Sequence, residues 1–343
     1  MKYKQLGNTG MFVSEICLGA MTFSQGRGGF AAVGSMDQAG ANNLVKKSIE
    51  AGVNLIDTAD VYSAGQSEEM LGQALRDLEV RRSEVVIATK CMGRMGPGAN
   101  DQGASRGHIM DSVDASLKRL GTDHIDLYQI HANDPVAPVE ETMRALDDIV
   151  RTGKVRYIGC SNWQAWKIMK AQGAAERLGG TRFETLQAYY SIAGRELERE
   201  LVPMIEDQKM GVMVWSPLAG GLLSGKYDRD GKGPQGARRT SFAFPPVDMA
   251  RAGKCIDAMR DVAKAHDTSV ARIALAWLLA KPHVMSVIIG ARNEEQLMDN
   301  LGAAKVSLAP DDMKKLDEAS ALPPEYPGWM LAMQAGGRRP QPK

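Results

Sequence analysis

Eight short apolar runs, each followed by a longer segment of helical period, recur along the chain from Glu15 onward. Several runs are rich in β-branched residues, and each has the length of a strand. Short apolar runs that alternate with amphipathic segments are typical of βα units and a parallel sheet. The expected strands are Ile16–Ala20, Val53–Thr58, Val85–Thr89, Ile125–Ile130, Val155–Cys160, Thr185–Ala188, Val212–Trp215 and Val287–Ile289.

Helical segments lie between these runs, and a glycine separates several of them from the next strand. Glycine suits the left-handed residue that ends many helices. We expect this conformation at Gly52, Gly121, Gly153, Gly179 and Gly211. The expected helices are Ala41–Ala51, Glu68–Leu78, Arg106–Leu120, Val139–Thr152, Trp163–Leu178, Leu201–Lys209 and Val270–Ala280.

No change of composition and no Pro/Ser-rich linker divides the repeat. Open doubly wound sheets usually divide into halves, so eight consecutive units favour closure into a (β/α)8 barrel. The sequence therefore predicts a single α/β domain over residues 1–343, with the barrel at about residues 15–305 and a C-terminal helix and tail at 310–343.

Three segments lie outside the repeat. Lys2–Val13 has turn-forming glycines between apolar residues and predicts a β-hairpin that closes the floor of the barrel. Ala219–Val247 is a long loop, and loops of that length are usually functional. The tail opens with an expected helix at Asp311–Ala319, and further on it carries apolar residues that could cover a binding site: Trp329, Met330 and Met333.

Composition limits the classes of function. Hydrophobic residues make up 44% of the chain and charged residues 24%, as in a globular protein with an ordinary core. The net charge is +1 without runs of one sign, which argues against nucleic acid and membrane surfaces as partners. The four widely spaced cysteines suggest neither disulfides nor a metal site, and we expect neither a secretory leader nor a membrane-spanning segment. We expect a soluble, cytoplasmic protein.

Ionisable residues stand at the ends of the expected strands, where barrel enzymes carry their chemistry. Asp57, Lys90 and His131 end or follow three strands, and Tyr62 lies five residues after Asp57. A phenol can deliver the proton that a carbonyl oxygen needs as hydride reaches the carbonyl carbon. We expect the Lys90 ammonium to lower the pKa of Tyr62, and Asp57 to hold that ammonium in place. His131 would donate a hydrogen bond to the carbonyl oxygen.

An ordered set of motifs covers nearly the whole chain. They are GVNLIDTADVYSAGQSEEMLGQAL (Gly52–Leu75), VIATK ending at Lys90, DLYQIH ending at His131, GCSNW (Gly159–Trp163), WSPLAGGLLSGKY (Trp215–Tyr227) and VIIGARNEEQLMDN (Val287–Asn300). With these motifs the sequence resembles the aldo-keto reductase superfamily, and within it the bacterial and potassium-channel β-subunit branch.

The resemblance implies an NADPH-dependent reductase whose catalytic tetrad is Asp57, Tyr62, Lys90 and His131. It also implies that Trp215 stacks on the nicotinamide and that Arg292 pairs with the 2′-phosphate, since guanidinium binds phosphate through two hydrogen bonds. The implied cofactor-binding residues are Thr22, Asp57, Ser161, Asn162, Gln187, Trp215, Ser216, Pro217, Leu218, Gly220, Leu222, Lys226, Gly290, Arg292, Gln296 and Asn300. The candidate substrate-pocket residues are Tyr62, His131 and Trp329.

The reading from the residues leaves two other functions open. Lys90 could form a Schiff base in a barrel lyase. The chain could also be a cofactor-bound regulatory subunit similar to the channel β-subunits. Loops set specificity in barrel enzymes, so we expect Met21–Met36, Ala219–Val247 and the tail to encode the choice of substrate. A small carbonyl or alcohol is the expected substrate, and a homo-oligomer is compatible with the sequence.

Overall fold

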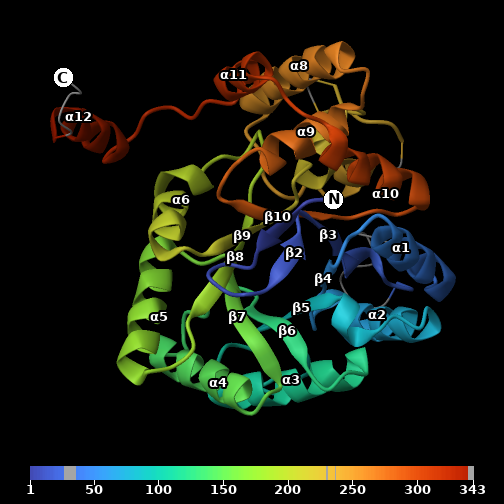
Figure 1. The fold of residues 1–343 in the computed structure, drawn as a ribbon, viewed down its shortest axis with the longest axis vertical. Coiled ribbons are helices and arrows are strands. Elements are labelled where there is room, and N and C mark those ends of the chain that lie inside the picture. Colours follow the sequence, from blue (N-terminus) through green and yellow to red (C-terminus); the bar gives the residue numbers. More distant parts are fainter. Residues whose placement is uncertain (27–35, 229–230, 236, 339–343) are drawn as a thin grey trace.

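The structure is a computed structural model that describes residues 1–26, 36–228, 231–235 and 237–338. Within these residues, eight parallel strands form a closed barrel in chain order, and the last strand pairs with the first. Figure 1 shows the helices around this barrel. The predicted α/β barrel is confirmed. Its strands are β3 (Ile16–Gly19), β4 (Leu55–Asp57), β5 (Val86–Cys91), β6 (Ile125–Ile130), β7 (Val155–Ser161), β8 (Phe183–Tyr189), β9 (Gly211–Trp215) and β10 (Val284–Ile289).

All eight expected strands occur, and all but Ile125–Ile130 have shifted ends. The strand expected at Thr185–Ala188 extends over Phe183–Tyr189, because Phe183 pairs with β7 and Tyr189 pairs with β9. The strand expected at Val53–Thr58 shortens to Leu55–Asp57, the part that pairs with its neighbours. Pairing with neighbouring strands, which the local pattern does not contain, sets these ends.

The seven helices expected in the repeat and the one expected at Asp311–Ala319 are also present, most with ends shifted by a few residues. The outer layer comprises α1 (Gln38–Glu50), α2 (Gln66–Asp77), α3 (Arg106–Leu120), α4 (Val139–Arg151), α5 (Ala165–Leu178), α6 (Leu197–Gln208), α8 (Met249–Ala265), α9 (Val270–Leu279), α10 (Glu294–Leu301) and α11 (Pro310–Ala319). A further helix, α12 (Gly328–Arg338), follows in the tail. Short helical turns are η1 (Ala20–Thr22), η3 (Tyr62–Gly65), η4 (Arg82–Glu84), η5 (Ala219–Ser224), α7 (Arg238–Ser241) and η6 (Gly302–Lys305). None of the helices in the described part of the chain is long and apolar enough to span a membrane.

Helices α8 and α10 were not expected from the sequence. The α8 segment has an N-cap signal, because the side chain of Asp248 accepts hydrogen bonds from the backbone of Ala250 and Arg251. Asn293 caps α10 in the same way through Gln296. The loop expected at Ala219–Val247 also contains short helical turns, and part of the loop Met21–Met36 lies outside the described residues.

One glycine has a different role from the expected one. Gly52, Gly121, Gly153 and Gly179 adopt the predicted positive φ, but Gly211 is the first residue of β9. Lys209 takes the left-handed position at the end of α6 instead, with φ of 53°. Gly211 is needed for space, since a Cβ there would come within 2.6 Å of the Met285 sulfur and 3.0 Å of the Gly7 nitrogen.

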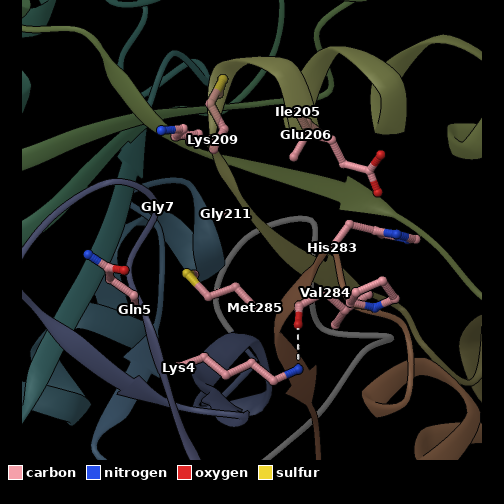
Figure 2. Close-up of a pocket in the computed structure, with 12 residues that line it drawn as sticks. Lys4, Gln5, Gly7, Ile205, Glu206, Lys209, Gly211, His283, Val284 and Met285 are labelled. Atoms are coloured by element: carbon pink, nitrogen blue, oxygen red, sulfur yellow. Dashed lines mark hydrogen bonds between the residues drawn. The ribbon is translucent and has the colours of Figure 1, made fainter.

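The N-terminal hairpin closes the floor of the barrel, as predicted. It consists of β1 (Tyr3–Gln5) and β2 (Phe12–Ser14), and Leu6 in its turn packs fully buried against residues of the barrel interior such as Leu55 and Leu127. The Lys4 ammonium donates to the Val284 carbonyl at 2.7 Å. A cavity of about 340 Å³ lies beside this contact. Figure 2 shows the residues that line it. The starts of β9 and β10 line it, so it lies at the end of the barrel opposite the catalytic residues.

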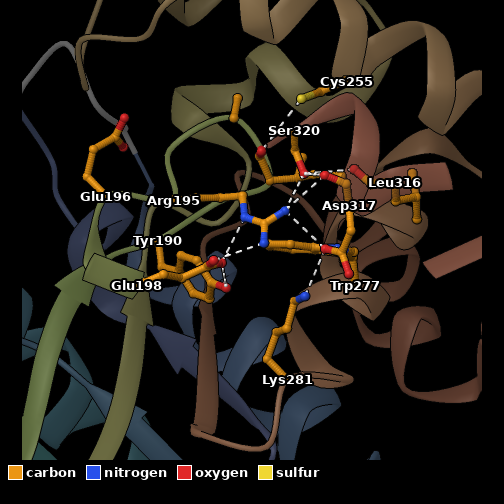
Figure 3. Close-up of polar contacts among 12 residues, drawn as sticks. Tyr190, Arg195, Glu196, Glu198, Cys255, Trp277, Lys281, Leu316, Asp317 and Ser320 are labelled. Carbon is orange, nitrogen blue, oxygen red and sulfur yellow. Dashed lines mark hydrogen bonds and ion pairs between the residues drawn. The ribbon is translucent and has the colours of Figure 1, made fainter. Parts of the chain in front are cut away.

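The C-terminal helix α11 is fastened to the barrel by a polar network around Arg195 (Figure 3). The guanidinium donates to both carboxyl oxygens of Glu198, at 2.8 and 2.9 Å. It also reaches Asp317 on α11 at 3.1 Å, and Asp317 accepts from the Trp277 indole at 3.0 Å and from Lys281 at 2.9 Å. Figure 1 shows the following helix, α12, set apart from the barrel.

Candidate active site

Lys90 forms the centre of the site. It lies near the end of β5, is fully buried, and donates to Asp57 Oδ2 at 2.7 Å, to the Thr58 carbonyl at 2.7 Å and to the Tyr62 hydroxyl at 3.4 Å. Burial acts to lower the pKa of Lys90, but the adjacent Asp57 and Tyr62 outweigh burial and raise this pKa above its ordinary value. Lys90 is therefore an ammonium ion near neutral pH.

Asp57, at the end of β4, is held on its other side by two amides. Gln187 Nε2 donates to Asp57 Oδ1 at 2.8 Å, and Gln129 Nε2 donates to the same oxygen at 3.4 Å. The side chain of Asp57 is almost fully buried, so these bonds orient the carboxylate toward Lys90. The structure thus brings Gln187, which was expected to bind the cofactor, into contact with Asp57.

Tyr62 begins the short turn η3, in which Ser63 and Ala64 have positive φ of 51° and 54°. Such left-handed non-glycine residues are strained and occur often at functional sites. Burial is the largest effect on the pKa of Tyr62 and raises it, while the Lys90 charge acts to lower it. The pKa of Tyr62 is therefore not lowered, contrary to expectation, because the residue is largely buried, with only 9% of its surface exposed. The phenol is protonated near neutral pH.

His131 follows β6 directly and contacts Tyr62. The two rings lie edge to face with centroids 5.6 Å apart. Burial and the Lys90 charge lower the pKa of the His131 imidazole to about 3. The ring is therefore neutral at working pH, with one N–H to donate. The tetrad residues expected from the sequence thus lie around one point.

A chain of hydrogen bonds leads from His131 to Trp215. The Asn162 amide donates to the His131 carbonyl at 3.1 Å and to Ser161 Oγ at 3.0 Å. The Trp215 indole donates to Asn162 Oδ1 at 3.0 Å. Asn162 has a φ of 59°, so its side chain is placed by a left-handed backbone. Trp215, at the end of β9, also stacks on Phe244, with the ring centroids 5.8 Å apart and the ring planes at 4°.

The remaining predicted cofactor residues lie on η1, on the turn after β9, and on the loop and helix α10 that follow β10. Ser216 Oγ accepts from the Gly220 amide, Asn300 donates to the Gly290 carbonyl, and Thr22 donates to the Ala291 carbonyl. Gln296 accepts from the Arg292 amide at 3.1 Å. Pro217, Leu218 and Leu222 lie on or next to η5.

Lys226 and Arg292 bring two positive charges together. Burial, then the charge of Arg292, lowers the pKa of Lys226. Neither side chain has a carboxylate partner among the residues that the structure describes, and both are exposed. Two neighbouring cations without a counter-ion favour an anionic ligand.

One predicted site residue lies away from the site, and two residues of the site were not predicted from the sequence. Trp329 lies on α12, where its ring contacts Tyr326 and is 44% exposed, and the helix stands apart from the barrel (Figure 1). Gln129 was missed, although it lies two residues before His131 and so on the same face of a strand. Thr58 was also missed, because its carbonyl acts rather than its side chain. No group of three metal-ligating side chains occurs in the described ranges.

Comparisons with known proteins identify the family of the chain. The family model described as the aldo/keto reductase family matches residues 15–321. The chain is 36% identical over 338 residues to a probable voltage-gated potassium channel subunit beta of Arabidopsis thaliana, covering 95% of this chain and 99% of that protein. A putative aryl-alcohol dehydrogenase of Schizosaccharomyces pombe is 36% identical over 338 residues, covering 92% and 95% respectively. Versiconal hemiacetal acetate reductase of Aspergillus parasiticus is 33% identical over 347 residues, covering 96% and 99%. The chain belongs to the aldo/keto reductase family.

Proposed function

We propose that this protein reduces an aldehyde or ketone to an alcohol with NADPH, and that Tyr62 is the general acid. The family and the reductase and dehydrogenase names among the relatives support an oxidoreductase that acts on carbonyl groups. The observation that carries the finer proposal is the buried Lys90 ammonium, which contacts both Asp57 and the Tyr62 hydroxyl beside His131.

The four side chains divide the work on the carbonyl oxygen. NADPH, when bound, supplies hydride to the carbonyl carbon. Tyr62 donates its proton to the oxygen, and the Lys90 ammonium stabilises the phenolate that remains. His131, as a neutral imidazole, donates a hydrogen bond to the same oxygen. Asp57 keeps Lys90 charged and oriented. The same steps in reverse would oxidise an alcohol.

Several residues fit the proposed cofactor. Trp215 offers an aromatic face for a nicotinamide, and Ser161, Asn162 and Gln187 offer hydrogen-bonding groups for its carboxamide. Lys226 and Arg292 provide the paired positive charge that phosphate groups require. The Lys226 ammonium lies beside Gly221 in the glycine-rich turn after β9. A side chain at Gly221 would bring its Cβ to 3.6 Å from Lys226 Nζ.

Replacing Arg292 with alanine is expected to weaken NADPH binding at least about tenfold while changing NADH binding by less than about twofold, because only NADPH carries the 2′-phosphate. Fluorescence titration with both nucleotides measures the two dissociation constants. Arg272→Ala, which removes an arginine paired with Asp299, serves as the control. Equal weakening for both nucleotides would remove the phosphate role of Arg292.

Two other functions, a Schiff-base lyase and a regulatory subunit, were left open by the sequence. A Schiff base needs a neutral lysine, whereas Asp57 and Tyr62 hold Lys90 as an ammonium ion. The name of the Arabidopsis relative raises a regulatory role, in which nucleotide binds but turnover is slow. Oxidation of NADPH measured against a panel of aldehydes, ketones and quinones tests the enzyme directly. Tight NADPH binding without sustained turnover on any member would favour the regulatory role.

A further inference from the structure

Asp60 lies on the turn between two of the proposed catalytic residues, Asp57 and Tyr62. Its backbone amide donates to the Lys90 carbonyl at 3.1 Å, which fastens this turn to β5. Its side chain is fully buried. Neither carboxyl oxygen has a hydrogen-bond partner of good geometry among the described residues, and the nearby backbone amide of Val61 makes at most a weak contact with the carboxyl group. A buried carboxylate in that situation would be costly, whereas an uncharged carboxylic acid is much less so.

A count of charges around this turn supports an uncharged Asp60. Three carboxyl groups, those of Asp57, Asp60 and Glu68, share two cations. Lys90 pairs with Asp57 at 2.7 Å, and Arg119 pairs with Glu68 at 2.6 Å. Glu68 is further satisfied by the Thr89 hydroxyl at 2.6 Å. Both cations are therefore engaged, and the third carboxyl group has no cation of its own.

The groups that face Asp60 come from every neighbouring element. They are Glu68 on α2, Arg119 on α3, Lys90 and Cys91 on β5, Tyr128 on β6, and Tyr62 on η3. Burial and then the charge of Glu68 raise the pKa of Asp60 to about 8, against the opposing effects of the Arg119 charge, the Val61 backbone amide and the Lys90 charge. Cys91 and Tyr128 are buried groups whose own pKa values are raised, so neither offers Asp60 a positive charge.

We propose that Asp60 is a positioning residue that acts as an uncharged carboxylic acid, leaving the charge of Lys90 to be shared between Asp57 and Tyr62. This inference rests on the proposed role of Tyr62. An ionised Asp60 would compete for Lys90 and place a second negative charge near Tyr62, which makes the phenol a weaker acid. Its charge would also be buried next to the strained turn that carries Tyr62. Reduction should therefore fail as Asp60 loses its proton.

The test compares wild type with Asp60→Asn, in which a neutral amide replaces the neutral acid. With saturating NADPH and a reducible aldehyde, wild-type kcat is expected to fall about tenfold between pH 7 and pH 9, because one group with a pKa near 8 is then largely ionised. The variant should fall less than about twofold over the same range. Asp111→Asn, at an exposed carboxyl on α3, should keep the wild-type profile. An unchanged alkaline fall in Asp60→Asn would overturn the proposal.

Urea unfolding gives a readout that does not depend on activity. A folded-state pKa above the unfolded value means that the native protein holds a proton that the unfolded chain has lost between about pH 4 and pH 8. The free energy of unfolding of wild type should therefore decrease with rising pH in this window relative to that of Asp60→Asn. Equal pH dependence of the two proteins would show that Asp60 is ionised throughout.

The two readouts also separate this inference from the proposed function. If no carbonyl is reduced but the unfolding difference is found, the proposed function fails while Asp60 is still shown to be a neutral acid. If Asp60→Asn is recovered unfolded, infrared spectra of the wild type decide the question. A protonated carboxyl band at pH 7 that disappears by pH 9 supports the proposal, and its absence at pH 7 overturns it.

Discussion

Replacement of Tyr62 by phenylalanine is expected to lower kcat at least about a hundredfold and to leave the dissociation constant for NADPH nearly unchanged. The variant keeps the ring that packs against His131 and loses only the hydroxyl that contacts Lys90. Without this hydroxyl no group delivers a proton to the carbonyl oxygen. Steady-state kinetics with a reducible aldehyde measures the first quantity, and fluorescence titration measures the second.

The control makes the same chemical change at a tyrosine far from the tetrad. Tyr157 stands near the start of β7, toward the floor of the barrel. Tyr157→Phe should therefore leave kcat within about twofold of wild type. A Tyr62→Phe variant with near-normal turnover would exclude Tyr62 as the acid, and equal losses in both variants would point to a general effect on folding.

Replacement of Arg119 by methionine is expected to reduce the free energy of unfolding by about 3–5 kcal/mol. Glu68 is fully buried, and the Arg119 guanidinium is its only cationic partner among the described residues. Methionine fills part of the space but leaves Glu68 with the Thr89 hydroxyl alone. An unpaired buried carboxylate must then either stay charged at high cost or take up a proton. Urea unfolding at neutral pH measures the loss.

An exposed arginine provides the comparison for Arg119. Arg106, at the start of α3, pairs with Asp148, and both side chains are largely solvated. Arg106→Met should cost less than about 1 kcal/mol, because exposed ion pairs contribute little. Similar losses in the two variants would mean that burial of Glu68 does not determine the strength of the Arg119 pair.

The folded site implies a specific pH dependence on the acid side. With a pKa near 3 in the folded state and an ordinary value of 6.5, His131 binds no proton in the native protein where the unfolded chain does. Stability should therefore decrease as pH falls from about 6.5 toward 3. Unfolding of His131→Gln should lack this part of the acid dependence, which urea titrations at pH 7 and pH 5 would reveal. A slope identical to that of wild type would contradict the neutral imidazole.

The alternation of apolar runs and helical segments is sufficient by itself to predict the barrel architecture of this protein. Each run is short, local and buried on both faces, so its pattern is complete within a few residues. The same order predicted the meeting of Asp57, Lys90 and His131. Parallel strands that close on themselves bring their carboxyl ends to one edge, whatever the sequence distance between them.

Only the tertiary structure decided the electrostatics and the close packing. The pKa of Tyr62 depends on burial, which outweighs the neighbouring lysine that the sequence suggested. The charge count at Asp60 depends on Arg119, 59 residues away in the sequence numbering and on another helix. The space required at Gly211 depends on Gly7 and Met285. Desolvation and steric contact act between groups that are distant in the chain, and a local pattern carries no information about which of them will meet.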